Sequence, residues 1–202
     1  MPDLRCAAIV LAAGASTRLG RPKQLLRIEG EPLLRRTARL AVEAGCSPAY
    51  VVLGFEAEPM RRELANLAGV AVVLNKDWQE GMGSSLRAGM EAVRNLEPHP
   101  DAVLLLVCDQ PRLTADHLRR LLAQHKEAQT ADGVRITASV YARRAGVPAI
   151  FSGKLFGDLA HSSGDRGARN LIRAHADELG GIPWPEGELD VDRPEDLATI
   201  EP

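Results

Sequence analysis

The sequence predicts an α/β fold, built as a three-layer, doubly wound and mostly parallel sheet. Short and nearly continuous apolar runs, typical of strands covered by helices on both faces, alternate with amphipathic stretches long enough for helices. Because this β-α-β alternation repeats, the strands are expected to be parallel and joined by right-handed crossovers. The 202 residues suit a single domain, 1–202, in which we distinguish residues 1–130 from a small C-terminal region, residues 131–202.

Five runs of the sequence are the expected strands. They cover residues 6–12, 49–53, 70–74, 102–107 and 136–141. Four of these runs are almost entirely apolar, as expected for strands that are buried on both faces. Aromatic residues make up only 3% of the chain, so the core must be built from Leu, Val, Ile and Ala. A further short strand is expected at ELDVD, residues 188–192.

Four helices are expected between these strands, each with residues at its ends that favour helix termini. Proline begins and glycine ends the first helix, glycine follows the second, and serine or threonine caps the other two. They cover residues 32–45, 56–68, 84–96 and 114–127, and a last helix is expected from Pro194. The C-terminal region contains more glycine and proline and shorter apolar runs, so we expect it to have a role of its own.

Composition and charge argue against several classes of function. The formal net charge of −2 and the few aromatic residues disfavour nucleic-acid binding, which requires a basic face and usually stacking rings. No apolar stretch approaches the ~20 residues of a membrane helix, and no signal peptide is evident. The cysteines, Cys6, Cys46 and Cys108, are widely spaced, which fits reduced thiols and not zinc. We therefore expect a cytoplasmic protein that binds neither nucleic acid nor membranes.

The stretch LAAGASTRLGRPKQLL, residues 11–26, combines glycines with closely spaced cations directly after the first expected strand. It matches neither the phosphate loop GxxxxGK[ST] nor the dinucleotide fingerprint GxGxxG. A glycine-containing loop with free backbone N–H groups can still cradle a triphosphate, while cations neutralise its β- and γ-phosphates. The alternative is a solvated basic turn. The residues predicted here to bind a nucleotide are Leu11, Ala12, Ala13, Gly14, Ala15, Ser16, Arg18 and Lys23.

Asp109 follows the apolar run AVLLLVC and is expected at the carboxyl edge of the sheet, where ligands bind in open α/β folds. A carboxylate opposite a phosphate-binding loop is suited to hold Mg²⁺ that bridges the triphosphate. The alternative is an ordinary turn aspartate before Pro111. Side chains alternate along a strand, so Cys108 should point away from Asp109 and into the core.

Several segments together resemble one enzyme family. AAGASTRLGRPKQLL, NKDWQEGMGSSLRAG, VCDQP, GVPAIF, GDRGARNLI and DVDRPEDL occur in this order and span nearly the whole chain. The sequence is similar to the nucleotidyltransferases with a glycosyltransferase-A-like, Rossmann-like fold, and within them to the molybdenum cofactor cytidylyltransferases and related guanylyltransferases. The resemblance implies Mg²⁺-dependent transfer of CMP from CTP to the phosphate of the molybdenum-bearing pterin, with release of pyrophosphate. It also implies a molybdoenzyme that receives the product.

The resemblance also implies roles for individual residues. Arg18, Lys23 and Asp109 would be catalytic, with Asp109 and Asp192 as metal ligands and Asp190 as the alternative to Asp192. On the residues alone, Asp192 is equally well explained as the cap of the last helix.

Two further segments complete the predicted site. Gly81 and Ser85 match positions that line the nucleobase pocket, and Asn75 at a strand end is expected to read the nucleotide, although helix capping and turn chemistry also explain such residues. Residues 1–130 would then form the nucleotide-binding part and 131–202 the acceptor-side part. The residues expected to bind the acceptor phosphate through backbone donors and an arginine are Gly164, Asp165, Arg166 and Gly167, with Arg169 as the alternative arginine and a capped helix start as the alternative reading.

Other functions remain open. One alternative is a related enzyme that uses GTP, but the loop carries AAG where the guanylyltransferases tend to carry AGG, which favours CTP. The acceptor can also be a sugar or alditol phosphate. A non-catalytic nucleotide-binding protein that delivers the cofactor is a different class, and a Rossmann-type oxidoreductase is disfavoured because GxGxxG is missing.

Overall fold

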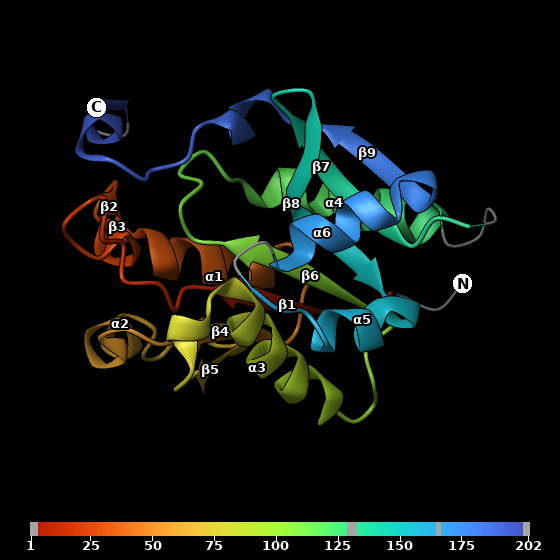
Figure 1. The fold of residues 1–202 in the computed structure, drawn as a ribbon, viewed down its shortest axis with the longest axis horizontal. Helices are drawn as coiled ribbons and strands as arrows, with labels where there is room; N and C mark the ends of the chain where they lie inside the picture. Colours follow the sequence, from red (N-terminus) through yellow and green to blue (C-terminus); the bar gives the residue numbers. More distant parts are fainter. Residues whose placement is uncertain (1–3, 129–132, 165–166, 200–202) are drawn as a thin grey trace.

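The computed structural model of the chain describes residues 4–128, 133–164 and 167–199. Seven strands form one sheet in the order β5-β4-β1-β6-β8-β7-β9 (Figure 1). Five of them are the strands predicted from the sequence: β1 (Cys6–Leu11), β4 (Ala49–Leu53), β5 (Val70–Leu74), β6 (Ala102–Val107) and β7 (Ile136–Tyr141). The sequence analysis missed β8 (Arg144–Ser152) and β9 (Leu179–Pro183), as well as a small antiparallel pair, β2 (Arg27–Ile28) and β3 (Glu31–Pro32).

The sheet is mostly parallel, as predicted. Strands β5, β4, β1 and β6 pair in parallel, with Cys6 opposite Ala102 and Leu11 opposite Val107 in the central pair. Strand β8 is the exception, because it runs antiparallel between β6 and β7. Strand β9 then adds to β7 in parallel. Residues from both the N-terminal and the C-terminal part of the chain therefore contribute to one continuous sheet.

Helices cover both faces of the sheet (Figure 1). Alternate residues of β1 and β6 pack against α1 (Leu33–Glu43), α2 (Ala57–Glu63) and α4 (Ala115–Ala128) on one face. The intervening residues pack against α3 (Met82–Arg94), α5 (Phe156–Ala160) and α6 (Gly167–Ala174) on the other. Every residue of β1 is buried, which explains why its sequence is apolar without alternation. This arrangement confirms the three-layer α/β fold.

The order of the strands creates a crevice at the carboxyl ends of β1 and β6. From β1 the chain moves outward to β4 and β5, and it then crosses to β6 on the other side of β1. The loops that leave β1 and β6 therefore diverge at a topological switch point, where open α/β sheets bind their ligands. These loops are residues 12–22 and 108–114, and they contain Arg18, Asp109 and the predicted nucleotide-binding residues 12–16.

Three local predictions were wrong. The ELDVD segment forms no strand but runs beside the loop after β6, where the Val191 N–H donates to the Asp109 carbonyl oxygen (2.9 Å). The last helix is a 3-10 turn (Pro194–Thr199), and the carboxylate of Asp196, not that of Asp192, accepts the N–H groups at its start. Helix α3 begins at Met82, before the serines expected to cap it. None of the described helices is long and apolar enough to span a membrane.

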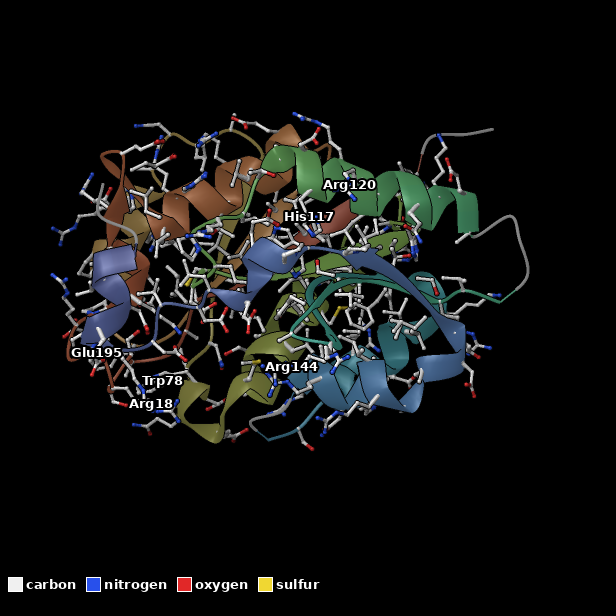
Figure 2. All side chains as sticks on the ribbon, turned by 90° about the horizontal axis from the view of Figure 1, so that it is seen from above. Arg18, Trp78, His117, Arg120, Arg144 and Glu195 are labelled. Atoms are coloured by element: carbon white, nitrogen blue, oxygen red, sulfur yellow. The ribbon has the colours of Figure 1, made fainter. Side chains whose placement is uncertain are left out.

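Figure 2 labels His117 on α4, and the surroundings of this side chain hold it in a neutral form. Its Nε2 lies 2.8 Å from Oγ of Ser139, and that hydroxyl donates to the Pro148 carbonyl oxygen, so Nε2 carries the proton. The imidazole stacks on the Trp184 indole at 4.6 Å between ring centroids, and Nδ1 is buried with no hydrogen-bond partner in the described part of the chain. A second proton on Nδ1 would therefore place an unpaired charge inside the core.

His125, further along the same helix, is fully buried, and its Nδ1 lies 3.0 Å from Oγ1 of Thr137. Burial lowers the pKa of His125 to about 4. Burial, with the nearby charge of Arg120, lowers the pKa of His117 to about 4 as well. Both rings remain neutral in the folded protein at neutral and mildly acidic pH.

We expect the free energy of unfolding to fall as the pH drops from 7 to 5. The histidines titrate near 6.5 in the unfolded chain but near 4 in the folded protein, so the unfolded state binds more protons in this window. Their contribution is complete above the unfolded pKa, and at pH 5 about 2 kcal/mol is lost for each. Urea unfolding of the wild type and of the His117→Gln, His125→Asn double variant measures this, and the variant should be less acid-sensitive. An equal loss in both proteins would contradict it.

Candidate active site

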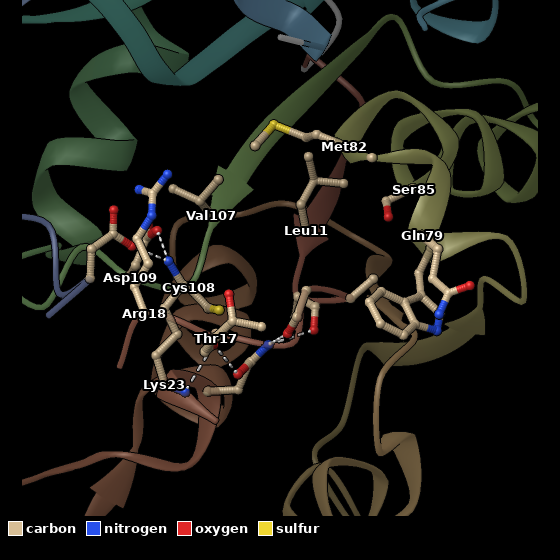
Figure 3. A pocket seen from close by; sticks show the side chains of 18 residues that line it. Leu11, Thr17, Arg18, Lys23, Gln79, Met82, Ser85, Val107, Cys108 and Asp109 are labelled. Carbon is tan, nitrogen blue, oxygen red and sulfur yellow. Dashed lines mark hydrogen bonds and ion pairs between the residues drawn. The ribbon is translucent and has the colours of Figure 1, made fainter. Parts of the chain in front are cut away.

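A cavity of about 450 Å³ opens at the carboxyl ends of β1 and β6, within the size range of small-molecule sites (Figure 3). Arg18, Lys23 and Asp109 lie at one side of it, and Gln79 and Ser85 lie at the other. Its lining includes eleven of the residues predicted from the sequence, namely Leu11, Ala12, Ala13, Gly14, Ser16, Arg18, Lys23, Gly81, Ser85, Asp109 and Asp192. Of the nucleotide-binding predictions, Ala15 and Asn75 do not line it.

The loop after β1 presents unpaired backbone donors. Within the described chain, the N–H groups of residues 13–17 have no hydrogen-bond partner. Gly14 is exposed, and a Cβ built on it meets no atom within 4 Å, so the fold itself does not require glycine there. A glycine at such a place allows a ligand to approach the backbone closely. The loop therefore has the donors and the open surface that a phosphate chain requires.

Lys23 lies between two carboxylates that are far apart in the sequence. Its Nζ donates to Oδ2 of Asp109 at 2.6 Å and to Oδ1 of Asp192 at 2.7 Å. Burial opposes the charge of Lys23, but the attraction of Asp109 and the hydrogen bonds to Asp109 and Asp192 outweigh it and raise the pKa of Lys23. The ammonium group is therefore charged at any pH at which the protein is folded.

Asp109 keeps one oxygen without a partner. Its Oδ2 accepts from Lys23, whereas Oδ1 is buried and has no hydrogen-bond partner in the described part of the chain. Buried carboxylate oxygens are rarely left unpaired, and an unpaired oxygen in a residue that lines a cavity fits a cation. No group of three or more His, Cys, Asp or Glu residues that could hold a metal occurs among the described residues. Two carboxylates, with nucleotide oxygens and water for the remaining positions, are a donor set that fits Mg²⁺.

Asp190 differs from Asp192 in its contacts. It makes no ion pair with Lys23, although it lies two residues away from Asp192 in the sequence. The residue as a whole is exposed, but partial desolvation of its carboxyl group, followed by the charges of Asp109 and Asp192, raises the pKa of Asp190 to about 7. Asp192 is therefore the aspartate that joins Asp109 at Lys23.

The far side of the cavity is formed by the start of α3 and by the turn before it. Gly81 precedes α3 with φ +99°, and Ser85 faces the cavity from the first turn of the helix. Trp78 and Gln79, which the sequence analysis missed, extend this wall. The ring of Phe55 packs edge to face against that of Trp78, with 5.5 Å between the ring centroids, and this contact helps to fix the position of Trp78.

Asn75 lies behind this wall. Its amide nitrogen donates to the hydroxyl oxygens of Ser84 (2.8 Å) and Ser85 (3.0 Å), while its oxygen accepts the N–H of Asp77. The side chain is buried and ties β5 to the start of α3. In this structure Asn75 thus supports Ser85 instead of facing the cavity.

The predicted acceptor segment lies beside the start of α3. The Gly83 N–H donates to the Gly164 carbonyl oxygen at 2.9 Å. A Cβ on Gly167 would lie 3.3 Å from Cγ of Met82, and Met82 belongs to the cavity lining. Asp165 and Arg166 lie outside the described residues. Of this segment, the described residues Gly164 and Gly167 are next to the cavity but are not part of its lining.

Arg18 and Cys108, two residues that line the cavity, differ in how accessible their side chains are. Arg18 is exposed at the mouth of the cavity and has no hydrogen-bond or ion-pair partner among the described residues. Cys108 is 2% exposed and packs in the core, as expected from its position beside Asp109. Burial, together with the negative charge of Asp109, raises the pKa of the Cys108 thiol to about 12, so this residue is no nucleophile at neutral pH.

Proteins similar to this chain cover most of its length. Nicotine blue oxidoreductase of Paenarthrobacter nicotinovorans is 36% identical over 181 residues, which are 85% of this chain and 83% of that protein. The crystal structure of Rv0371c from Mycobacterium tuberculosis H37Rv matches with a TM-score of 0.78 at 30% identity, covering 99% of this chain and 98% of that one. A structure of Rv0371c in complex with manganese matches with a TM-score of 0.75 at 29% identity and covers 98% of both chains.

Residues 8–179 match a protein family described as the MobA-like NTP transferase domain. The match begins within β1 and ends at the first residue of β9, so it includes the loop after β1, the start of α3 and Asp109. The chain therefore belongs to the MobA-like NTP transferase family.

Proposed function

We propose that this protein transfers CMP from CTP to the phosphate of the molybdenum-bearing pterin cofactor and releases pyrophosphate, with Mg²⁺ as the cofactor. The observation that carries the proposal is the position of Lys23 between Asp109 and Asp192, beside a loop of unpaired backbone N–H groups. The backbone N–H groups and Lys23 can bind a triphosphate, and the two carboxylates can bind a divalent cation. Membership of the MobA-like family supports nucleotidyl transfer as the class of reaction.

The loop residues 11–16 would bind the triphosphate through their backbone, with Arg18 and Lys23 neutralising its charge. Asp109 and Asp192 would hold Mg²⁺, which when bound neutralises phosphate charge as a Lewis acid. The unpaired Oδ1 of Asp109 supports this assignment, and the manganese complex of Rv0371c shows that a relative binds a divalent metal. Asp190 is the weaker candidate because it makes no ion pair with Lys23 among the described residues.

The transfer itself needs no nucleophile from the protein. An oxygen of the acceptor phosphate, which is already an anion at neutral pH, attacks the α-phosphorus in line. The bond from that phosphorus to the oxygen bridging it to the β-phosphate breaks, and pyrophosphate leaves with the bonding electrons. The protein's contribution is to position the two reactants and to stabilise the charge on the leaving group. Arg18 and Lys23 are the described cations that line the cavity.

We assign the nucleobase to the wall formed by Gly81, Ser85 and the neighbouring Trp78 and Gln79. Asn75 would act indirectly, because it holds Ser85 in place. The acceptor would bind to the C-terminal part, residues 131–202, through the segment from Gly164 to Gly167 with Asp165 and Arg166. The closeness of Gly167 to Met82, which lines the cavity, supports this assignment. The product would pass to a molybdoenzyme in the cytoplasm.

Pyrophosphate release tests the proposal directly. Purified protein is mixed with Mg²⁺ and the pterin cofactor, and CTP, GTP, ATP and UTP are supplied separately. Turnover with CTP alone is the expected result. Turnover with GTP instead would keep the reaction but overturn the donor, and turnover only with a sugar or alditol phosphate in place of the pterin would overturn the acceptor. Nucleotide binding without pyrophosphate release from any acceptor would indicate a cofactor-delivery protein.

The name of the relative from Paenarthrobacter nicotinovorans raises oxidoreduction as a second candidate. The loop after β1 does not carry GxGxxG, the pattern that binds dinucleotides at this position of an α/β sheet. We therefore expect neither NADH nor NADPH to bind. Calorimetric titration with both dinucleotides checks this, and binding that competes with CTP would favour the oxidoreductase.

A further inference from the structure

Gln24 is the most deeply buried polar side chain that lines the cavity, with 1% of its surface exposed. It directly follows Lys23 in a short 3-10 turn (Lys23–Leu25). A buried amide must find partners for its donors and its acceptor, or it destabilises the fold. The partners of Gln24 are all in the loop after β1, which is the loop that the proposed function assigns to the triphosphate.

The amide of Gln24 contacts this loop at three places. Its Nε2 donates to the carbonyl oxygens of Ala12 (3.0 Å) and Gly14 (2.7 Å). Its Oε1 accepts the hydroxyl of Ser16 at 3.2 Å. The same hydroxyl oxygen accepts the backbone N–H of Lys23 at 3.2 Å, so the two ends of the loop are joined through Ser16.

These contacts fix the direction of the backbone donors. In a planar trans peptide the C=O and the following N–H point in opposite directions. When the carbonyls of Ala12 and Gly14 point at Gln24, the N–H groups of Ala13 and Ala15 must point away from it. Ser16 adopts φ +51°, a left-handed conformation that a serine seldom holds without support. The loop is thus held in one conformation from its inner side.

We infer that Gln24 is a positioning residue, which aims the backbone N–H groups of the loop at the phosphate chain of the nucleotide without touching the nucleotide itself. This inference rests on the proposed function only for the identity of the ligand, because the contacts of Gln24 exist without it. No other described side chain donates to the carbonyl oxygens of Ala12 and Gly14, so the loop has no substitute for this amide.

Two substitutions separate the hydrogen bonds from the volume of the side chain. Gln24→Met keeps a long side chain but donates nothing, so the carbonyl oxygens of Ala12 and Gly14 lose this donor. Gln24→Glu is nearly isosteric, but its ionised carboxylate would face those two carbonyl oxygens. We expect affinity for magnesium tripolyphosphate and for the preferred nucleotide to fall about 10- to 100-fold with Met and further with Glu at pH 8.

The pH dependence of the Glu variant distinguishes positioning from a loss of packing. A protonated carboxyl group can donate one hydrogen bond, so the affinity of Gln24→Glu should approach that of the wild type as the pH falls from 8 to 5.5. The ratio between wild type and Gln24→Met should stay nearly constant over the same range. Calorimetric titrations of the three proteins measure these ratios.

Thr37→Val provides the matched control. Thr37 is also buried, and its hydroxyl donates to the Leu33 carbonyl oxygen inside α1, so the variant loses a buried hydrogen bond away from the loop. Its nucleotide affinity should remain within about twofold of the wild type. If Thr37→Val binds as weakly as Gln24→Met, the effect reflects stability and the inference is overturned.

Amide hydrogen exchange tests the role of Gln24 without any ligand. The amides of Leu19, Gly20 and Lys23, whose hydrogen bonds all go to Ser16, should exchange faster in Gln24→Met than in the wild type, while β1 and β6 exchange at unchanged rates. Unchanged exchange in the loop, or unchanged affinity in both Gln24 variants, would overturn the inference. A wild type that binds neither tripolyphosphate nor any nucleotide would instead overturn the proposed function, and the exchange experiment would still decide the role of Gln24.

Discussion

Replacing Asp109 by asparagine is expected to lower kcat about 1,000-fold or more, on the scale found when one charged or hydrogen-bonding group is removed from a transition-state site. The amide has nearly the shape of the carboxylate and can still accept a hydrogen bond from Lys23. What it lacks is the negative charge and the anionic Oδ1, which is the unpaired buried atom of the site. Pyrophosphate release under saturating nucleotide and Mg²⁺ measures the effect.

Asp101→Asn is the matched control for this substitution. Asp101 also carries an ion pair, with Arg5, but it lies on the surface at the opposite end of β6. Exposed ion pairs contribute little to stability, so kcat should be unchanged and stability only slightly lower. Asp109→Asn should also lose Mn²⁺ binding in the presence of nucleotide. Full activity in Asp109→Asn would contradict the assignment of the metal to this carboxylate.

The strands that could be predicted are those buried on both faces. Strand β1 has no exposed residue, and its uninterrupted apolar run predicted a strand that is buried on both faces. Strand β8 was missed because it contains Gly146 and Pro148, residues that normally disfavour a strand. Its glycine is explained only by the packing, since a Cβ on Gly146 would lie 2.6 Å from the hydroxyl oxygen of Tyr141. Strand β9 lies at the sheet edge, where glycine and proline are tolerated.

The residues of the site also fall into two groups: those that a local sequence pattern predicts and those that only the fold brings together. Lys23 and Asp109 could be predicted because each stands in a short motif directly after a strand. The role of Gln24 could not be predicted, because its partners are backbone carbonyls and no local sequence pattern indicates that its side chain points inward. The pairing of Lys23 with Asp192 joins residues 169 positions apart, and only the fold brings them together. Asp192 was expected either as a metal ligand or as a helix cap, and Asp196 takes the capping role.

Lys23 now occupies the space between the two carboxylates that would bind the metal. Its ammonium group lies 2.6 Å from Asp109 and 2.7 Å from Asp192, so it neutralises them in the nucleotide-free protein. A divalent cation must compete with this internal cation unless Lys23 moves to a phosphate. Metal binding and nucleotide binding should therefore strengthen each other, because the nucleotide offers Lys23 another anionic partner.

Replacing Lys23 by methionine should accordingly have two opposite effects. Catalysis should fall about 100-fold or more, because a cation that stabilises the phosphates is lost. Without nucleotide, however, Mn²⁺ should bind at least about tenfold more tightly than to the wild type, since one displaced cation is worth more than 1.4 kcal/mol even at a partly exposed site. Calorimetric titration with MnCl₂ measures the affinity, and thermal unfolding measures the linked rise in Tm.

The variant without metal should also be less stable than the wild type, by about 1–3 kcal/mol, because two carboxylates then face each other without a counter-ion. Added Mn²⁺ should restore this loss in Lys23→Met and raise the Tm of the wild type much less, since at a given concentration a ligand that binds the folded state more tightly stabilises it more. Lys126→Met, in the last turn of α4, is the control for removing a lysine elsewhere and should leave Mn²⁺ affinity unchanged. If Mn²⁺ binds wild type and Lys23→Met equally, Lys23 does not compete with the metal. Asp109 and Asp192 would then hold the cation at a distance from the ammonium group, and the coupling between metal and nucleotide would have to arise from direct contact between the two ligands.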